Sequence, residues 1–160
     1  MKKYALSAAV MLSLAGFAAA AAEVPMKFNI INKANTTLEN GVVTVKNTDA
    51  KGGGVNTILD LNQTEPVKIV LSGESKCDES NGIKNAHDYS LYIDLTYADG
   101  TKKYGVVVPF DPQNREWQKK VNEFMPPKPI KQARVYILFR FHTGAAQFKN
   151  LKFEEIKETK

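Results

Sequence analysis

The sequence has a single cysteine, Cys77, among its 160 residues. One thiol cannot form an intramolecular disulfide, so the fold must be stabilised by its core rather than by bridges. Two acidic residues, Asp78 and Glu79, follow Cys77 directly, and negative charge nearby raises the pKa of a thiol. This setting disfavours a reactive thiolate, and we interpret Cys77 as a loop or strand-end residue without a catalytic role.

Histidine is equally scarce, and the motifs of common enzymes are missing. The two histidines, His87 and His142, fit neither an H-E-x-x-H motif nor a histidine cluster. There is no G-x-S-x-G elbow, and Gly52-Gly53-Gly54 lacks the Gly-Lys-Ser/Thr of a phosphate loop. The best single acid, Asp94, has no second carboxylate that its spacing identifies as a partner for glycoside cleavage. We therefore expect no enzymatic activity.

Long apolar runs are absent beyond the N-terminus. There, Lys2 and Lys3 precede an apolar stretch from Ala5 to Ala15, and small residues follow from Ala18 to Ala22. This is the pattern of a secretory signal peptide, with cleavage expected before Glu23. The sequence thus predicts signal peptide 1–22, a single domain over 23–160 and no transmembrane segment after signal removal. We expect an exported protein, periplasmic or extracellular, from a bacterium.

Concentrated positive charge is missing as well. Of the 22 lysines and arginines, Lys2 and Lys3 fall in the predicted signal peptide and none of the 17 acidic residues does, so the net charge falls from +5 to +3. The remaining charges are interspersed without a basic block. Nucleic-acid binding needs a basic stripe or patch, so we expect no nucleic-acid partner.

Period-two alternation is the dominant pattern in the rest of the chain. From Leu91 to Tyr97 apolar and polar residues alternate, which predicts a strand with one buried face. Asp99-Gly100 follows as a hairpin signal, with 104–110 as the partner strand. In 134–142, Val135, Ile137, Phe139 and Phe141 occupy one face of a further strand, opposite Tyr136, Arg140 and His142.

Other short stretches also have strand character, and no amphipathic helix of ten residues is present. The further predicted strands are 28–32, 42–45, 55–61, 66–72, 117–124 and 147–156. Gly52-Gly53-Gly54 and 76–87 are the two stretches we expect to be most flexible. Many short strands separated by turn signals favour an all-β antiparallel sandwich or barrel.

One stretch resembles a known class of domain. Residues 88–101, Asp-Tyr-Ser-Leu-Tyr-Ile-Asp-Leu-Thr-Tyr-Ala-Asp-Gly-Thr, resemble a segment of galactose-binding-like jelly-roll domains. These are similar to carbohydrate-binding modules of families four, nine, sixteen and twenty-two. The stretches 110–118, 127–140 and 142–148 agree in order with the same domains. The resemblance covers about 28–156 and implies a two-sheet β-sandwich that binds polysaccharide without catalysis.

Binding in such a module would use the exposed face of one sheet. Strand parity and the resemblance together suggest six ligand-binding residues. Tyr92, Tyr104 and Trp117 would stack on sugar rings, and Asp94, Arg140 and His142 would hydrogen-bond to hydroxyls. The expected partner is a glycan or polysaccharide, with a separate polysaccharide-degrading enzyme or a surface complex as a further partner. The alternatives are a structural or protein-interaction sandwich without a sugar site and a small polysaccharide-active enzyme.

The resemblance also implies a structural calcium ion. In the related modules the closing strand commonly reads Phe-Asp-Asp-Val, and one of its aspartates helps to bind the ion. This chain reads Phe148-Lys149-Asn150-Leu151. Calcium prefers anionic oxygen ligands, so we expect no cofactor, with a structural calcium ion as the alternative.

Overall fold

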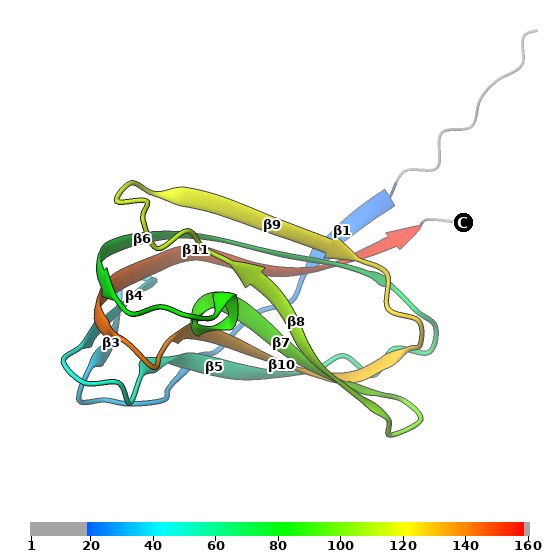
Figure 1. The fold of residues 1–160 in the computed structure, drawn as a ribbon. Coiled ribbons are helices and arrows are strands. Elements are labelled where there is room, and N and C mark those ends of the chain that lie inside the picture. The colour runs from blue at the N-terminus through cyan, green and yellow to red at the C-terminus, as the bar shows by residue number, and fades with distance from the viewer. Residues whose placement is uncertain (1–18, 159–160) are drawn as a thin grey trace, which may run out of the picture.

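The protein is described by a computed structural model, which covers residues 19–158. Two antiparallel sheets face each other in that region (Figure 1). One sheet, called sheet A here, contains β3 (Thr36–Glu39), β4 (Val42–Asn47), β11 (Thr143–Glu158), β6 (Lys68–Asn81) and β9 (Gln118–Phe124) in that order, with β1 (Ala19–Glu23) beside β11. Sheet B contains β2 (Asn29–Ile30), β5 (Gly53–Asp60), β10 (Ile130–Phe139), β7 (Tyr89–Tyr97) and β8 (Lys102–Pro109).

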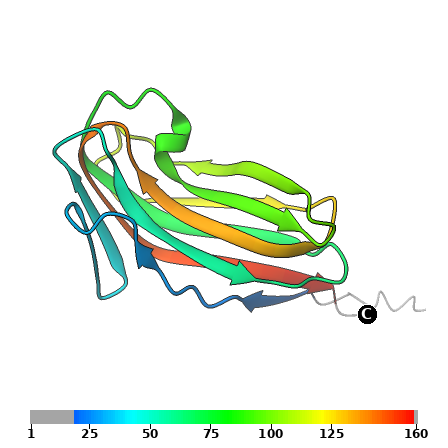
Figure 2. The same ribbon diagram turned by 90° about the horizontal axis from the view of Figure 1, so that it is seen from below.

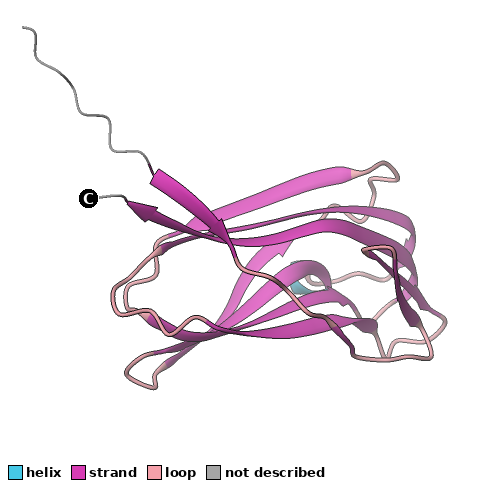
Figure 3. Ribbon diagram, turned by 180° about the vertical axis from the view of Figure 1, so that it is seen from behind, coloured by secondary structure: helices cyan, strands magenta, loops and turns pink. Residues whose placement is uncertain are grey.

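Successive strands mostly change sheet, as the figures show from below and from behind (Figures 2 and 3). From β4 to β7 and again from β8 to β11, every connection crosses between the layers. Only the hairpins β3–β4 and β7–β8 stay within one sheet. The sole helical turn among the described residues is the 3₁₀ turn η1 (Ala86–Asp88). This confirms the predicted all-β jelly-roll sandwich.

The core lies between the sheets and comes from the alternating strands. On β7 the residues Tyr89, Leu91, Ile93 and Leu95 are buried, while the side chains between them are mostly half-exposed. Sheet A supplies Phe148 and Phe153 from β11 to the same core. Tyr89 also joins the layers, because its hydroxyl lies 2.6 Å from the Ser75 Oγ on β6. Period-two alternation therefore identified the core correctly on these strands.

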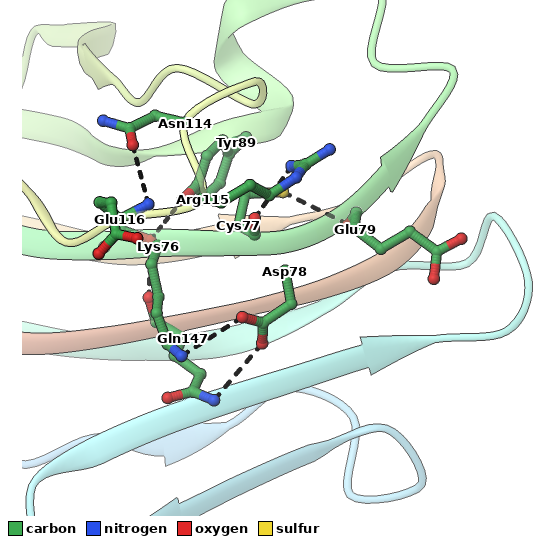
Figure 4. Close-up of polar contacts among 10 residues, drawn as sticks. Lys76, Cys77, Asp78, Glu79, Tyr89, Asn114, Arg115, Glu116 and Gln147 are labelled. Carbon is green, nitrogen blue, oxygen red and sulfur yellow. Dashed lines mark hydrogen bonds and ion pairs between the residues drawn. The ribbon is translucent and has the colours of Figure 1, made fainter.

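Two stretches that were expected to be flexible are largely strand instead. The stretch 76–87 was expected to be flexible, but β6 extends to Asn81 and pairs with β11 over this length. Cys77 is consequently a fully buried strand residue, not a loop or strand-end residue (Figure 4). Burial raises the pKa of its thiol, and Asp78 adds to the rise. Likewise Gly53 and Gly54 begin β5 and are buried, so the glycine stretch is mostly part of sheet B.

The predicted signal peptide is mostly outside the described residues. Residues 1–18 lie outside them, whereas Ala19–Ala22 belong to β1 and pair with the end of β11. Cleavage before Glu23 stays a prediction. No helix within residues 19–158 is long and apolar enough to cross a membrane.

Candidate functional site on sheet B

Four of the six predicted ligand-binding residues lie together on the outer face of sheet B. Alternation turns Tyr92 and Asp94 of β7 away from the core, because their neighbours Leu91, Ile93 and Leu95 point into it. The neighbouring strand β10 is in register with β7, so Tyr136 stands opposite Tyr92 and Arg134 opposite Asp94. Figure 2 looks toward this sheet.

The face contains two hollows. The first, called the Tyr92 hollow here, has a volume of about 360 Å³. Its lining is Ile31, Lys51, Gly52, Gly53, Tyr92, Asp94, Tyr136, Leu138, Arg140 and Phe141. The second, the Tyr104 hollow, has a volume of about 130 Å³. Its lining is Asp94, Leu95, Thr96, Lys102, Tyr104, Gln132 and Arg134. Asp94 belongs to both, so the hollows adjoin along the sheet.

Two tyrosines belong to the lining of the Tyr92 hollow. The rings of Tyr92 and Tyr136 are 5.9 Å apart and tilted edge to face. Burial raises the pKa of the Tyr92 phenol, and the nearby Asp94 carboxylate raises it further. The phenol therefore stays protonated at neutral pH and is able to donate a hydrogen bond. A ring surface with polar groups at its rim suits the alternating apolar and hydroxyl surfaces of a sugar.

Arg140 is held rigidly at the end of this hollow. Its Nε donates to the Asp88 Oδ1 at 3.2 Å, and its backbone N–H donates to the Asp88 carbonyl oxygen at 3.0 Å. The guanidinium lies 4.8 Å from the centre of the Phe141 ring. Gly52 permits this packing, since a Cβ built there would lie 2.4 Å from the Arg140 Cβ. These contacts hold the guanidinium in one orientation. The entropic cost of a ligand binding to its two terminal NH₂ groups is therefore lower.

The corner after β10 reverses the expected alternation. Phe141 was expected on the face of Val135, Ile137 and Phe139, and His142 on the opposite face with Arg140. Instead Phe141 has φ of 60° and is 61% exposed, while His142 is only 3% exposed. Phe141 lies in the corner between β10 of sheet B and β11 of sheet A, so the alternation of β10 does not continue through it. The His142 ring packs edge-on against Phe139 at 4.1 Å and does not reach the hollow.

Trp117 also lies away from this face. It immediately precedes β9, and β9 pairs with β6 of sheet A rather than with sheet B. Lys149 Nζ lies 3.9 Å from the centre of its ring, and Lys76 Nζ lies 5.8 Å from it. The expected single cluster of six residues is therefore wrong in two members: the structure brings together Tyr92, Asp94, Tyr104 and Arg140, and separates Trp117 and His142.

Sequence reasoning did not select several residues that line the site. Tyr136 has the same strand parity as Arg140, and that signal was available in the sequence. Phe141 had no signal, because its exposure depends on one backbone dihedral angle. Asp88 is buried beneath Arg140, and only the tertiary structure brings these two together.

Two larger hollows lie elsewhere. One, of about 510 Å³, opens beside β11 between β1 and β4, and its rim has the Glu23–Lys152 ion pair at 3.2 Å. The other, of about 630 Å³, is formed by the β5–β6 loop and the end of β11. Neither contains an aromatic pair in its described lining, so volume alone does not favour them over the face of sheet B.

The closing strand does not fit a calcium ion. Lys149 Nζ lies 3.6 Å from the Glu74 Oε2, and Asn150 Nδ2 donates to the Glu74 Oε1 at 2.9 Å. One carboxylate surrounded by two nitrogen donors has no free anionic oxygen to offer a hard cation. Across residues 19–158 no group of three His, Cys, Asp or Glu side chains is placed to hold a metal. The absence of a cofactor stays a prediction.

Comparison with known proteins supports the fold. No protein-family model and no curated protein matches the sequence. Among solved structures, a family 4 carbohydrate-binding module matches with a TM-score of 0.52 and 11% identity, over 80% of this chain and 77% of that chain. The CBM22-1 and GH10 modules of Clostridium thermocellum endo-1,4-β-D-xylanase 10B, complexed with xylohexaose, match with a TM-score of 0.53 and 12% identity.

The match to the xylanase 10B structure covers 88% of this chain but 27% of that chain. The enzymatically active domain of tailspike protein 4 from bacteriophage CBA120 has a TM-score of 0.55 and 7% identity, over 89% of this chain and 20% of that chain. This chain thus spans about a fifth to a quarter of these two proteins. At such identities the likeness establishes the fold, which is that of carbohydrate-binding modules, as the sequence resemblance predicted.

Proposed function

We propose that the protein is an exported, non-catalytic carbohydrate-binding module and that its glycan binds to the outer face of sheet B. One observation supports this most strongly: the aromatic rings of Tyr92 and Tyr136 line one hollow together with Asp94 and a fixed Arg140. The fold shared with carbohydrate-binding modules supports it independently. The two hollows that meet at Asp94 suit an extended chain better than a single sugar.

The roles follow from the positions of the side chains. Tyr92 and Tyr136 present ring surface to the apolar side of a pyranose, and their hydroxyls remain available for hydrogen bonds. Asp94 accepts hydrogen bonds from sugar hydroxyls, although one oxygen already accepts from the Gly105 N–H at 3.3 Å. Arg140 donates from its terminal NH₂ groups, and the exposed Tyr104 extends the surface along β8. A separate polysaccharide-degrading enzyme or surface complex is the proposed protein partner.

The test is retention on a panel of immobilised polysaccharides. Tyr92→Ala and Tyr136→Ala should each weaken binding about tenfold, because a well-placed aromatic contact contributes about 1.5 kcal/mol. Trp117→Ala is the matched control: it removes an aromatic ring from the other sheet and should leave affinity unchanged. Failure to bind any glycan of a broad panel would overturn the proposal, and release of reducing ends would show catalysis instead.

A further inference from the structure

The outer face of sheet B has an excess of cationic side chains, although the whole chain is only weakly basic. Lys51 and Arg140 line the Tyr92 hollow, and Lys102 and Arg134 line the Tyr104 hollow. Asp94 is the one acidic residue in the described lining of both. Two of the four cations have acidic partners outside the lining: Lys51 Nζ lies 3.3 Å from the Asp49 Oδ2, and Arg140 pairs with Asp88. Lys102 and Arg134 form no ion pair with the described residues, so the unpaired positive charge that attracts an anionic ligand lies at the Tyr104 hollow.

The positions of the arginines suit this surface to carboxylate or sulfate groups. The chain has three arginines among its 22 basic residues. Arg115 serves the fold, because its Nη1 donates to the carbonyl oxygens of Cys77 at 2.9 Å and Pro112 at 2.8 Å (Figure 4 shows the Cys77 contact). Of the other two, Arg134 precedes Tyr136 by two residues on β10, and Arg140, just after β10, lines the Tyr92 hollow together with Tyr136. A guanidinium binds carboxylate or sulfate oxygens through two parallel hydrogen bonds, which an ammonium cannot do.

Both guanidinium groups retain free donors. Arg140 uses its Nε for Asp88. Arg134 forms no ion pair with residues 19–158, and within these residues its side chain meets the Tyr136 hydroxyl at 3.5 Å, which is too long for a strong hydrogen bond. Arg134 is also exposed, so an incoming anion would meet it without displacing a protein partner.

We propose that the ligand is an acidic polysaccharide, whose carboxylate or sulfate groups bind Arg134 and Arg140 while its sugar rings lie on Tyr92 and Tyr136. This rests on the proposed glycan-binding function and names the class of glycan. Charged groups repeated along a polymer reach both arginines from one chain, which a single anionic sugar does not. Because the net charge of the whole protein is small, the preference for an acidic polymer would come from these two arginines rather than from overall charge.

Matched polymer pairs test this proposal by isothermal titration calorimetry on the intact protein. Polygalacturonate is compared with its carboxyl-reduced form, and dextran sulfate with dextran. At least one acidic polymer should bind about tenfold more tightly than its neutral twin. Raising NaCl from 50 to 500 mM should weaken that binding, because salt screens exposed charges. The acidic polymer that binds identifies whether carboxylate or sulfate is recognised.

Variants distinguish binding by the arginines of the site from attraction by the overall charge of the protein. Arg134→Gln should weaken acidic-polymer binding about tenfold, and Arg134→Lys should be intermediate because it keeps the charge and loses the fork. Lys46→Gln is the matched control, since Lys46 is exposed on β4 of sheet A. Equal binding of the neutral twin, or equal loss in Lys46→Gln and Arg134→Gln, overturns the proposal.

The two proposals fail differently. Binding to neutral glycans that depends on Tyr92 and Tyr136 but not on Arg134 refutes the acidic ligand and leaves the glycan-binding function standing. Loss of all glycan binding refutes both. Because Arg134 is exposed, thermal unfolding of Arg134→Gln should match that of the unaltered protein, which shows that any lost affinity is not lost folding.

Discussion

Asn47 holds the corner that carries Arg140 and Phe141, and replacing it with aspartate tests how that corner is built. Asn47 ends β4 and is 4% exposed. Its Nδ2 donates to the carbonyl oxygens of Phe139 at 2.7 Å and of His142 at 3.3 Å, one on each side of the two site residues. Its Oδ1 accepts from the Asn35 Nδ2 at 2.9 Å. Asn47→Asp keeps the shape and the accepted bond but removes both donated bonds.

The expected cost is large. Each buried carbonyl left without a donor costs about 1–3 kcal/mol, so the two together cost about 4 kcal/mol. For a domain of this size, that corresponds to a fall in Tm of about 12 °C. The introduced carboxyl group faces two carbonyl oxygens, so its pKa in the folded state should rise above its unfolded value of about 3.9. The loss should therefore be greater at pH 7 than at pH 4.

Urea denaturation provides the assay, with Trp117 fluorescence and far-ultraviolet circular dichroism as independent probes. Asn122→Asp, at a half-exposed position on the edge strand β9, is the matched control and should cost under about 0.5 kcal/mol. Glycan affinity of folded Asn47→Asp should also fall, because Arg140 and Phe141 lose their fixed support. A loss of stability below about 1 kcal/mol at pH 7 would refute the reasoning.

Two further predictions concern His142 and Gly54. Burial lowers the pKa of His142 in the folded state, so the protein should lose stability as pH falls below about 6.5, the pKa of a histidine in the unfolded chain. Urea titrations between pH 7.5 and 5.5 should show that His142→Phe lacks this part of the pH dependence. An unchanged dependence of stability on pH in His142→Phe would contradict the prediction. Gly54→Ala should prevent stable folding, because at φ of 139° a Cβ there would lie 1.9 Å from the Ile137 carbonyl oxygen. Gly41→Ala is the control: its surroundings are open, so it should cost only about 1–2 kcal/mol. Similar melting temperatures for the two variants would exclude the proposed clash.

Regular strands were predictable because their signal is local. On β7, alternation alone placed Leu91, Ile93 and Leu95 in the core and Tyr92 and Asp94 outside it. The hairpin at Asp99-Gly100 was predictable for the same reason, since the turn depends on residues within it: Gly100 has φ of 82° there.

Other features required the tertiary structure. The polar end of β6 has no apolar alternation, and it becomes a strand only because β11 pairs with it. The short strand β3 was missed, because its four residues form a strand through pairing with β4. Which sheet a strand joins is equally non-local, and this is why Trp117 was expected on the wrong face.

By itself, the sequence determined the all-β class, the alternating core of β7 and most of β10, and the placement of Tyr92 and Asp94 on one outer face. Those features follow from a period of two and from short turns, which depend on neighbours in the chain. Only the tertiary structure decided that β10 lies beside β7 with Tyr136 opposite Tyr92, that Phe141 lines the same hollow, that Asp88 fixes Arg140, and that His142 turns inward. The physical reason is that Phe141, in the left-handed region, lies in the corner where the chain leaves sheet B for sheet A, and this corner is held by contacts from a distant strand, such as the bond from Asn47 to the Phe139 carbonyl oxygen.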